Sequence, residues 1–110
     1  MFRFSPDSPN GGWRNDQFRG YADHMQGAEF LRALARLIEL GDERPTAIMC
    51  AEALWFRCHR RLVSDALVAR GRRVLHIGSD GSVAAHELTP FASIEDGKVT
   101  YPPEQTALDV

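Results

Sequence analysis

Two short apolar runs on either side of a helical segment limit the folds open to this chain. Thr46 to Ala51 is mostly apolar without alternation, which is typical of a strand buried on both faces. Arg73 to Ile77 is predicted to be the next strand. The segment Cys58 to Gly71 between them is predicted to be a helix that buries Leu62, Val63, Ala66 and Leu67. Strand, helix and strand in this order predict a βαβ unit with parallel pairing and a right-handed crossover.

An amphipathic helix is predicted ahead of this unit, over residues 28–40. Its apolar residues recur at helical spacing, at Phe30, Leu31, Leu34, Leu37 and Ile38. Gly41 suits the C-terminal cap, and Pro45 prevents the helix from continuing. No strand is predicted before this helix, whereas a strand buried on both faces needs neighbours on both edges. We therefore expect that part of the sheet is missing, or that a second copy completes it in a homo-oligomer.

The predicted fold class is α/β, with a mainly parallel sheet, flanking helices and a hairpin-like C-terminal part. Turn signals at 79–81 (Ser-Asp-Gly) and 96–97 (Asp-Gly) predict that hairpin-like part, with Val83 to Leu88 as one strand. Pro, Asn, Asp and Gly residues near the N-terminus indicate irregular structure there. The expected organisation is an irregular segment, a single α/β domain and a tail, over residues 1–17, 18–102 and 103–110.

Composition narrows the function classes. The formal net charge of -2 argues against general nucleic-acid coating, which needs a basic surface. The 2 cysteines fit a reducing compartment. No apolar run approaches the length of a membrane span, and the first residues lack the apolar core of a secretory signal. We therefore expect a cytoplasmic protein without a membrane partner.

Arginine is concentrated in the predicted βαβ unit, between residues 57 and 73. The positions are Arg57, Arg60, Arg61, Arg70, Arg72 and Arg73. Codon bias in a GC-rich genome is one explanation. The other is functional, because arginine suits bidentate recognition of phosphate or carboxylate groups.

The segment MCAEALWFRCHRR, from Met49 to Arg61, is the candidate site. In open parallel sheets, ligands bind beyond the carboxyl ends of strands, where the chain turns into the next helix. Cys50 and Glu52 are expected at the strand end, with Cys58, His59 and Arg60 in the loop or first helical turn. Backbone amides and the helix dipole favour an anion there. A small anionic or nucleotide-like ligand is therefore expected.

Cys58 is the candidate nucleophile or redox thiol of this site. A helix N-terminus and nearby arginines favour the thiolate, which is the reactive form. The alternative is a buried cysteine that only packs. Glu52 and His59 are candidate acid–base groups. The alternative for Glu52 is a structural ion pair, and the alternative for His59 is a plain hydrogen bond. Cys50, inside the apolar run, is either a structural residue or a ligand contact.

A second cluster of candidate binding residues surrounds Gly20. Phe18, Arg19, Tyr21 and Asp23 bring aromatic, basic and acidic groups together and could line a pocket wall. The alternative is a helix start at which Phe18 and Tyr21 pack into the core while Arg19 and Asp23 pair with each other.

No metal and no cofactor is expected. Structural zinc sites bring their ligands in close pairs, whereas Cys50 and Cys58 are widely spaced and no Gly-rich phosphate loop is present. His76 is interpreted as a semi-buried, hydrogen-bonded strand residue. His24 and His86 offer no specific signal.

Several stretches of the chain resemble a known family. GGWRNDQFRGYADHM, MCAEALWFRCHRRLVSDAL and VLHI, in this order and spacing, are similar to motifs of the bacterial domain-of-unknown-function family 488. The closing segment HELTPFASIEDGKVTYP also resembles that family, so the similarity runs from about Gly11 to about Pro102. It implies a cytoplasmic α/β protein with a mainly parallel sheet, and it brings no assigned activity.

The resemblance also implies which residues recur in the family. They correspond here to Phe18, Arg19, Gly20, Tyr21, Asp23, Cys50, Glu52, Cys58, His59, Arg60 and Asp65. Family members begin with a strand, a helix and another strand that have no counterpart here. The resemblance therefore implies an N-terminally truncated version of the domain, in agreement with the incomplete sheet.

Three functions remain open from the sequence. The first is an enzyme for a small anionic or nucleotide-like substrate, with Cys58 as the thiol, Glu52 and His59 as acid–base groups, and Arg19 and Arg60 as anion contacts. The second is a non-catalytic module whose arginines between residues 57 and 73 bind phosphate or nucleic acid. The third is an inactive fragment.

Overall fold

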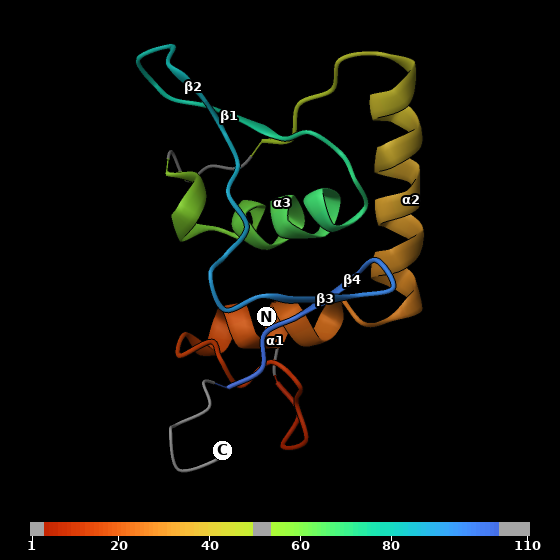
Figure 1. Cartoon of the computed structure of the whole chain (residues 1–110), viewed down its shortest axis with the longest axis vertical. Helices are drawn as coiled ribbons and strands as arrows, with labels where there is room; N and C mark the ends of the chain where they lie inside the picture. The colour runs from red at the N-terminus through yellow and green to blue at the C-terminus, as the bar shows by residue number, and fades with distance from the viewer. Residues whose placement is uncertain (1–3, 50–53, 104–110) are drawn as a thin grey trace.

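The computed structural model describes residues 4–49 and 54–103. Within these two ranges, three α-helices, a short 3₁₀ helix and four short strands follow one another (Figure 1). They are α1 (Asp16–His24), α2 (Ala28–Glu43), η1 (Trp55–Arg57), α3 (Arg60–Ala69), β1 (Leu75–Ile77), β2 (Val83–Ala85), β3 (Ser93–Glu95) and β4 (Lys98–Thr100). The chain is thus of mixed α and β structure.

The N-terminal segment leads into α1 through a side-chain cap. Oδ1 of Asn15 accepts hydrogen bonds from the amides of Gln17 (2.9 Å) and Phe18 (3.2 Å), which satisfies donors that the first helical turn leaves without a partner. The helix therefore begins at Asp16, within the stretch expected to be irregular. In Figure 1, α1 and α3 lie one above the other, and the two helices pack together.

Helix α2 confirms the prediction for residues 28–40 and extends it to Glu43. Phe30 and Leu34 are its buried residues, as their helical spacing predicts. The prediction that Gly41 forms the C-terminal cap was wrong, because the helix runs through this residue. It ends instead at Arg44, which is extended (φ -161°, ψ 160°) as expected for a residue before proline.

Helix α3 is shorter than its predicted range and ends in a Schellman motif. The amide of Gly71 donates to the carbonyl of Val68 (2.9 Å), and the amide of Arg72 donates to the carbonyl of Leu67 (3.0 Å). This geometry requires the left-handed backbone of Gly71 (φ 77°). Gly71 therefore lies just beyond the helix, near the end that the sequence predicted.

The strands form two separate antiparallel hairpins in the described part of the chain. Strand β1 pairs with β2, and β3 pairs with β4. The mainly parallel sheet predicted from the sequence is not found among the described residues. The chain turns back directly after β1, so β1 pairs with the strand that follows it and not with an earlier one. Residues 46–49 form no strand, and the rest of that predicted strand lies outside the described residues.

The hairpin-like character of the C-terminal part is confirmed, with shorter strands than expected. The turn between β3 and β4 has two residues with positive φ, Asp96 (53°) and Gly97 (77°). This is the backbone of a type I′ turn, for which Asp-Gly is a favoured pair. Strand β2 covers only the first half of the predicted strand from Val83 to Leu88.

The core lies where the three helices meet β4. Within it, Trp13 contacts Phe18 and Phe91 edge to face, at centroid distances of 5.0 and 4.8 Å. The buried cluster consists of Trp13, Phe18, Ala22, Met25, Phe30, Leu34, Leu62, Ala66, Val99 and Tyr101. Hairpin β1–β2 projects away from this core at the upper left of Figure 1, and Leu75, Ile77 and Val83 are exposed on it.

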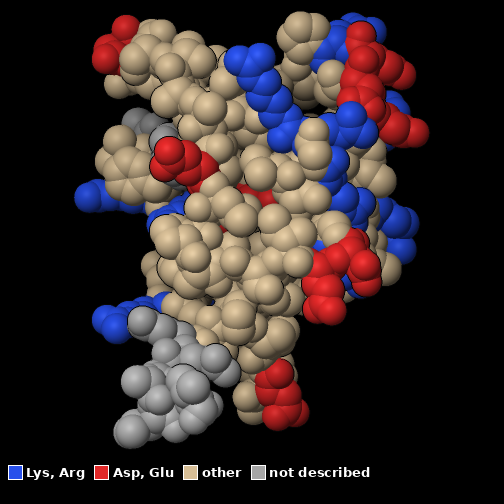
Figure 2. Space-filling view, in the orientation of Figure 1, with Lys and Arg blue, Asp and Glu red and all other residues tan. Residues whose placement is uncertain are grey.

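Charged side chains of both signs share the surface around α2. Figure 2 shows Lys and Arg beside Asp and Glu along the right-hand edge of the molecule, where α2 stands in Figure 1. Arg36 pairs with Glu39 at 3.2 Å, and Arg72 pairs with Asp42 at 3.0 Å. Within the described ranges, no helix combines the length and apolar character needed to cross a bilayer.

Candidate functional site

Cys58 lies in the turn between η1 and α3, with its sulfur at the start of α3. Its Sγ accepts hydrogen bonds from the backbone amide of Arg60 (3.3 Å) and from Nε of the same residue (3.0 Å). The side chain of His59, the residue before the helix, makes no capping hydrogen bond. The sulfur therefore accepts from the first amide of α3, although it is not a side-chain cap of the usual kind, which belongs to the N-cap residue and accepts from the second or third amide. Hydrogen bonds of this kind stabilise negative charge on sulfur.

The ring of His59 stacks on the ring of Tyr21 from α1. Their centroids are 4.1 Å apart and the planes differ by 17°. Phe18 meets the same imidazole edge to face at 6.0 Å, and Phe30 meets Tyr21 at 5.9 Å. Burial lowers the pKa of His59 below its ordinary value of 6.5 and raises the pKa of Tyr21. Both rings are therefore uncharged near neutral pH.

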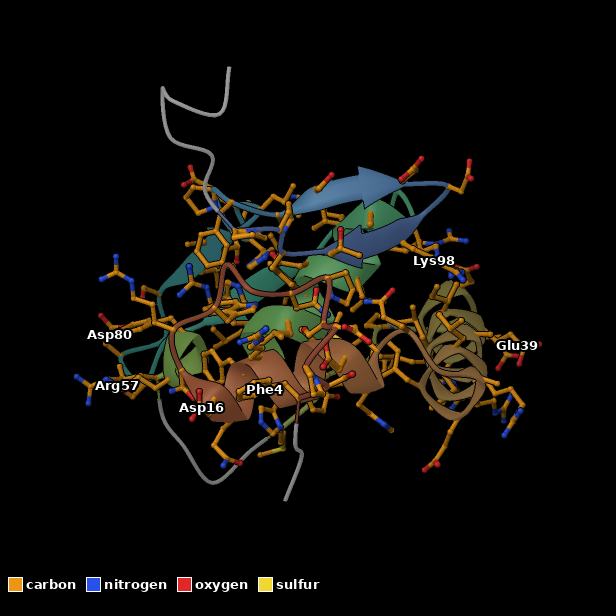
Figure 3. All side chains as sticks on the ribbon, turned by 90° about the horizontal axis from the view of Figure 1, so that it is seen from below. Phe4, Asp16, Glu39, Arg57, Asp80 and Lys98 are labelled. Atoms are coloured by element: carbon orange, nitrogen blue, oxygen red, sulfur yellow. The ribbon has the colours of Figure 1, made fainter. Side chains whose placement is uncertain are left out.

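These residues line a groove of about 780 Å³ between α1, α2 and the start of α3. Side chains that contribute to it include Tyr21, His24, Arg57, Cys58, His59 and Arg60. Arg57 extends outward from η1 at the left of Figure 3. The groove thus combines a thiol, cationic side chains and an aromatic wall in one place.

A second hollow, of about 880 Å³, lies beside Trp13, Phe91 and Pro103. None of the residues predicted for the site lines it. We regard the groove at Cys58 as the functional candidate, because chemically reactive side chains line it.

Asp23, one of the predicted binding residues, holds the N-terminal segment against α1. Its carboxylate accepts hydrogen bonds from the Ser5 amide (2.8 Å), the Ser8 hydroxyl (2.5 Å) and the Asn10 side-chain amide (2.7 Å). Asn10 is fully buried, and its Oδ1 accepts from the amide of Tyr101 (2.8 Å). The segment expected to be irregular is therefore fastened to both α1 and the end of the hairpin region.

Arg19 also faces the N-terminal segment. Its guanidinium lies over the ring of Phe4, 4.0 Å from the centroid, and Phe4 lies beside α1 in Figure 3. Its Nε is buried without a hydrogen-bond partner among the described residues. One part of the alternative stated for this cluster is confirmed, because Phe18 is in the core and Tyr21 packs against it. The other part, an ion pair between Arg19 and Asp23, is not found among the described residues.

The structure thus brings part of the predicted site together. Cys58, His59, Arg60 and Tyr21 line one groove, whereas Arg19 and Asp23 are not among its lining residues. Cys50 and Glu52 lie outside the described residues. Their expected roles, and those of Arg19 and Asp23 as ligand contacts, stay predictions.

A buried polar cluster around Asp65 was missed by the sequence reading. The carboxylate of Asp65, fully buried, accepts from His86 Nε2 (2.7 Å), the Thr89 amide (3.1 Å) and the Tyr101 hydroxyl (2.7 Å). No specific signal in the sequence pointed to His86, which bridges Asp65 and His76 in the structure. The expectation for His76 is confirmed, because it is half-buried and bonded to His86 at 2.7 Å.

No sequence signal places these residues together, because tertiary folding alone joins α3 to the two hairpins. Only Asp65 was singled out, through the family resemblance. In the described ranges, no group of three or more His, Cys, Asp or Glu side chains is arranged to hold a metal ion.

Searches of curated proteins and of solved structures each found no match. A family model described as "Domain of unknown function DUF488" matches residues 2–67, which is more than half of the 110-residue chain. The match ends within α3, so the resemblance of the closing segment stays a prediction. The chain belongs to the DUF488 family.

Proposed function

We propose that this protein is an enzyme whose Cys58 thiol reacts with a small anionic or nucleotide-like substrate bound in the groove. The observation that supports this most directly is the pair of hydrogen bonds from Arg60 to Sγ of Cys58. A sulfur held in this way is suited to exist as the thiolate, which is the nucleophilic form. Cys58 is buried, with 8% of its surface exposed, and access for a substrate is inferred from its place among the residues that line the groove.

The charge at the start of α3 supports an anionic partner. Arg60 begins the helix and Arg61 follows it, although the positive end of the helix dipole disfavours cations there. Negative charge on the sulfur or on a bound ligand offsets this cost. Arg57 adds a further cation at the groove, and the Tyr21–His59 stack offers a flat aromatic wall. These features together favour a planar anion.

The roles of the remaining groups follow from the same geometry. His59, whose pKa is lowered by burial, is proposed as an acid–base group of the groove. Arg60 and Tyr21 are the proposed ligand contacts. Three further proposals rest on the sequence alone. Glu52 is a second acid–base group, and Cys50, Arg19 and Asp23 are further ligand contacts. The third is that the protein is cytoplasmic.

The anion preference is tested with two alkylating reagents of similar size, negatively charged iodoacetate and neutral iodoacetamide. For Cys58, we expect the ratio of the iodoacetate rate to the iodoacetamide rate to be at least about fivefold higher in buffer than in urea. Arg60→Gln should remove most of this difference. Arg36→Gln, on the exposed face of α2, is the matched control and should leave it unchanged. Equal ratios in buffer and urea would contradict the proposal.

Exposed arginines support a second candidate, a non-catalytic phosphate or nucleic-acid binding module. Arg57, Arg70, Arg72 and Arg73 are all exposed. Binding to a short single-stranded oligonucleotide that falls steeply with salt and survives Cys58→Ser would favour this module over the enzyme. The exposed apolar residues of hairpin β1–β2 support the expected homo-oligomer, and a monomer in sedimentation velocity would exclude it.

A further inference from the structure

The groove at Cys58 has two chemically different ends, set by the elements that line it. In Figure 1, η1 stands above the start of α1, and α2 stands beyond the other end of α1. Arg57, Cys58 and Arg60 line the groove from η1 and the start of α3. Apolar side chains line it from α2. A ligand that spans the groove therefore meets cations at one end and apolar surface at the other.

The apolar end is one face of α2. The spacing of its lining residues, Phe30, Ala33, Leu34 and Leu37, places them on one side of the helix. Phe30 and Leu34 are buried in the core, whereas Ala33 is exposed and Leu37 is half-buried. The core therefore covers only part of this face. The remainder is apolar surface at the groove, which is the usual lining of small-molecule sites.

Aromatic rings connect the two ends of the groove. The imidazole of His59 stacks on the ring of Tyr21 at a centroid distance of 4.1 Å, and Tyr21 meets Phe30 edge to face at 5.9 Å. His24 also meets Phe30, at 5.9 Å. All four residues line the groove. A series of rings in contact therefore leads from the neighbour of the thiol to the apolar face of α2.

The charges of the lining residues favour one orientation of an anion. Arg57 is exposed at the η1 end, and none of the ion pairs among the described residues includes it. Glu29, in the first turn of α2, is the one carboxylate among the described residues that line the groove. A negative group is therefore attracted to the η1 end and repelled from the α2 end.

We propose that the groove binds an amphiphilic anion, a carboxylate joined to an apolar chain, with the carboxylate at Arg57 and Arg60 and the chain along α2. This inference rests on the proposed function for the reaction at Cys58, and it names the substrate class. A carboxylate is a planar anion and suits guanidinium groups. The volume of about 780 Å³ is within the range of small-molecule sites. A nucleotide carries polar groups over most of its surface and matches the apolar face of α2 less well.

The role of the chain is tested by isothermal titration calorimetry of the full-length protein with butyrate and octanoate. Both carry the same carboxylate, and octanoate has the longer apolar chain. We expect octanoate to bind at least about tenfold more tightly, because every methylene that leaves water strengthens binding. Equal binding of the two, no binding of octanoate, or tighter binding of adenosine monophosphate than of octanoate would overturn the proposal.

Two alanines of α2 distinguish the groove from other apolar surface. Ala33 lines the groove and Ala35 does not, and both are exposed. Ala33→Glu places a charge against the chain and should weaken octanoate binding by about tenfold. Ala35→Glu is the matched control and should leave the binding unchanged. Equal effects of the two variants would overturn the proposal, because octanoate would then bind elsewhere on the surface.

The carboxylate contact has its own readout. Arg57→Gln should weaken octanoate binding by about fivefold, because an attractive charge is lost, and Arg36→Gln should leave it unchanged. Unchanged binding in Arg57→Gln would overturn the position of the carboxylate. If Cys58 shows the expected preference for iodoacetate and octanoate does not bind, this inference is wrong and the proposed function stands. If octanoate binds as expected and Cys58 shows no such preference, the binding site stands and the proposed function fails.

Discussion

At the residue scale, the side-chain carboxylates of Asp23 and Asp65 each accept several hydrogen bonds from distant parts of the chain. Asp23 fastens the N-terminal segment to α1, and Asp65 fastens the segments on either side of β3 and β4 to α3. Charge-assisted hydrogen bonds are stronger than neutral ones, and an unmatched buried donor is costly. The two aspartates therefore hold together a chain whose strands are too short to do so.

The outcome for individual residues shows which kinds of site a sequence can predict. Cys58, His59 and Arg60 are adjacent in the chain, so their shared location was predictable, although their partner Tyr21 comes from a separate cluster. Asp65, His86 and Tyr101 come from three segments with no common pattern. Their meeting depends on how the hairpins pack on α3, and local spacing carries no information about that packing.

The lowered pKa values of two histidines predict how the free energy of unfolding depends on pH. His59 and His76 both have folded-state pKa values below the ordinary 6.5. Between these lowered values and 6.5, the unfolded chain binds more protons, so the free energy of unfolding should rise with pH and level off above that window. Urea unfolding from about pH 5 to about pH 8 measures this slope. His59→Gln should reduce it, and a slope of opposite sign across this window would show the account of these histidines to be wrong.

At the scale of secondary-structure elements, the helices were easier to predict from the sequence than the pairing of the strands. Helix α2 follows from its apolar spacing and from Pro45, and the end of α3 follows from Gly71. The strands are only three residues long, and a short apolar run does not reveal its partner. The turn at residues 78–82 decided the pairing of β1, because it returns the chain directly alongside the strand.

Two glycines in different elements give opposite expectations for the same substitution. Gly97→Ala should lower the free energy of unfolding by about 1 kcal/mol, because its φ of 77° disfavours a side chain. The added Cβ would also lie 3.1 Å from Nε of Arg70, which donates to the Gly97 carbonyl. Gly41→Ala lies in the body of α2 with nothing within 4 Å, and should stabilise by up to about 1 kcal/mol. Urea denaturation of both variants checks the pair, and equal effects of one sign would contradict it.

At the scale of the whole molecule, the helices and hairpin β3–β4 form the core, and hairpin β1–β2 lies at the periphery. Hairpin β3–β4 belongs to the core through Val99 and the adjacent Tyr101, whereas β1–β2 projects outward and touches the interior chiefly through His76 and His86. The groove at Cys58 lies between α1, α2 and the start of α3. The groove thus depends on three helices, of which the sequence predicted α2 and α3, and not on the parallel sheet that the sequence suggested.

The central claim is that folding creates a reactive thiol at Cys58. The direct measurement is the rate of iodoacetamide alkylation of this residue, followed by peptide mass spectrometry in buffer and in urea. We predict that Cys58 reacts faster in buffer than in urea, because Arg60 holds its sulfur only in the folded chain. Slower alkylation in buffer would show a thiol that only packs, and equal rates would show that the fold forms no such site.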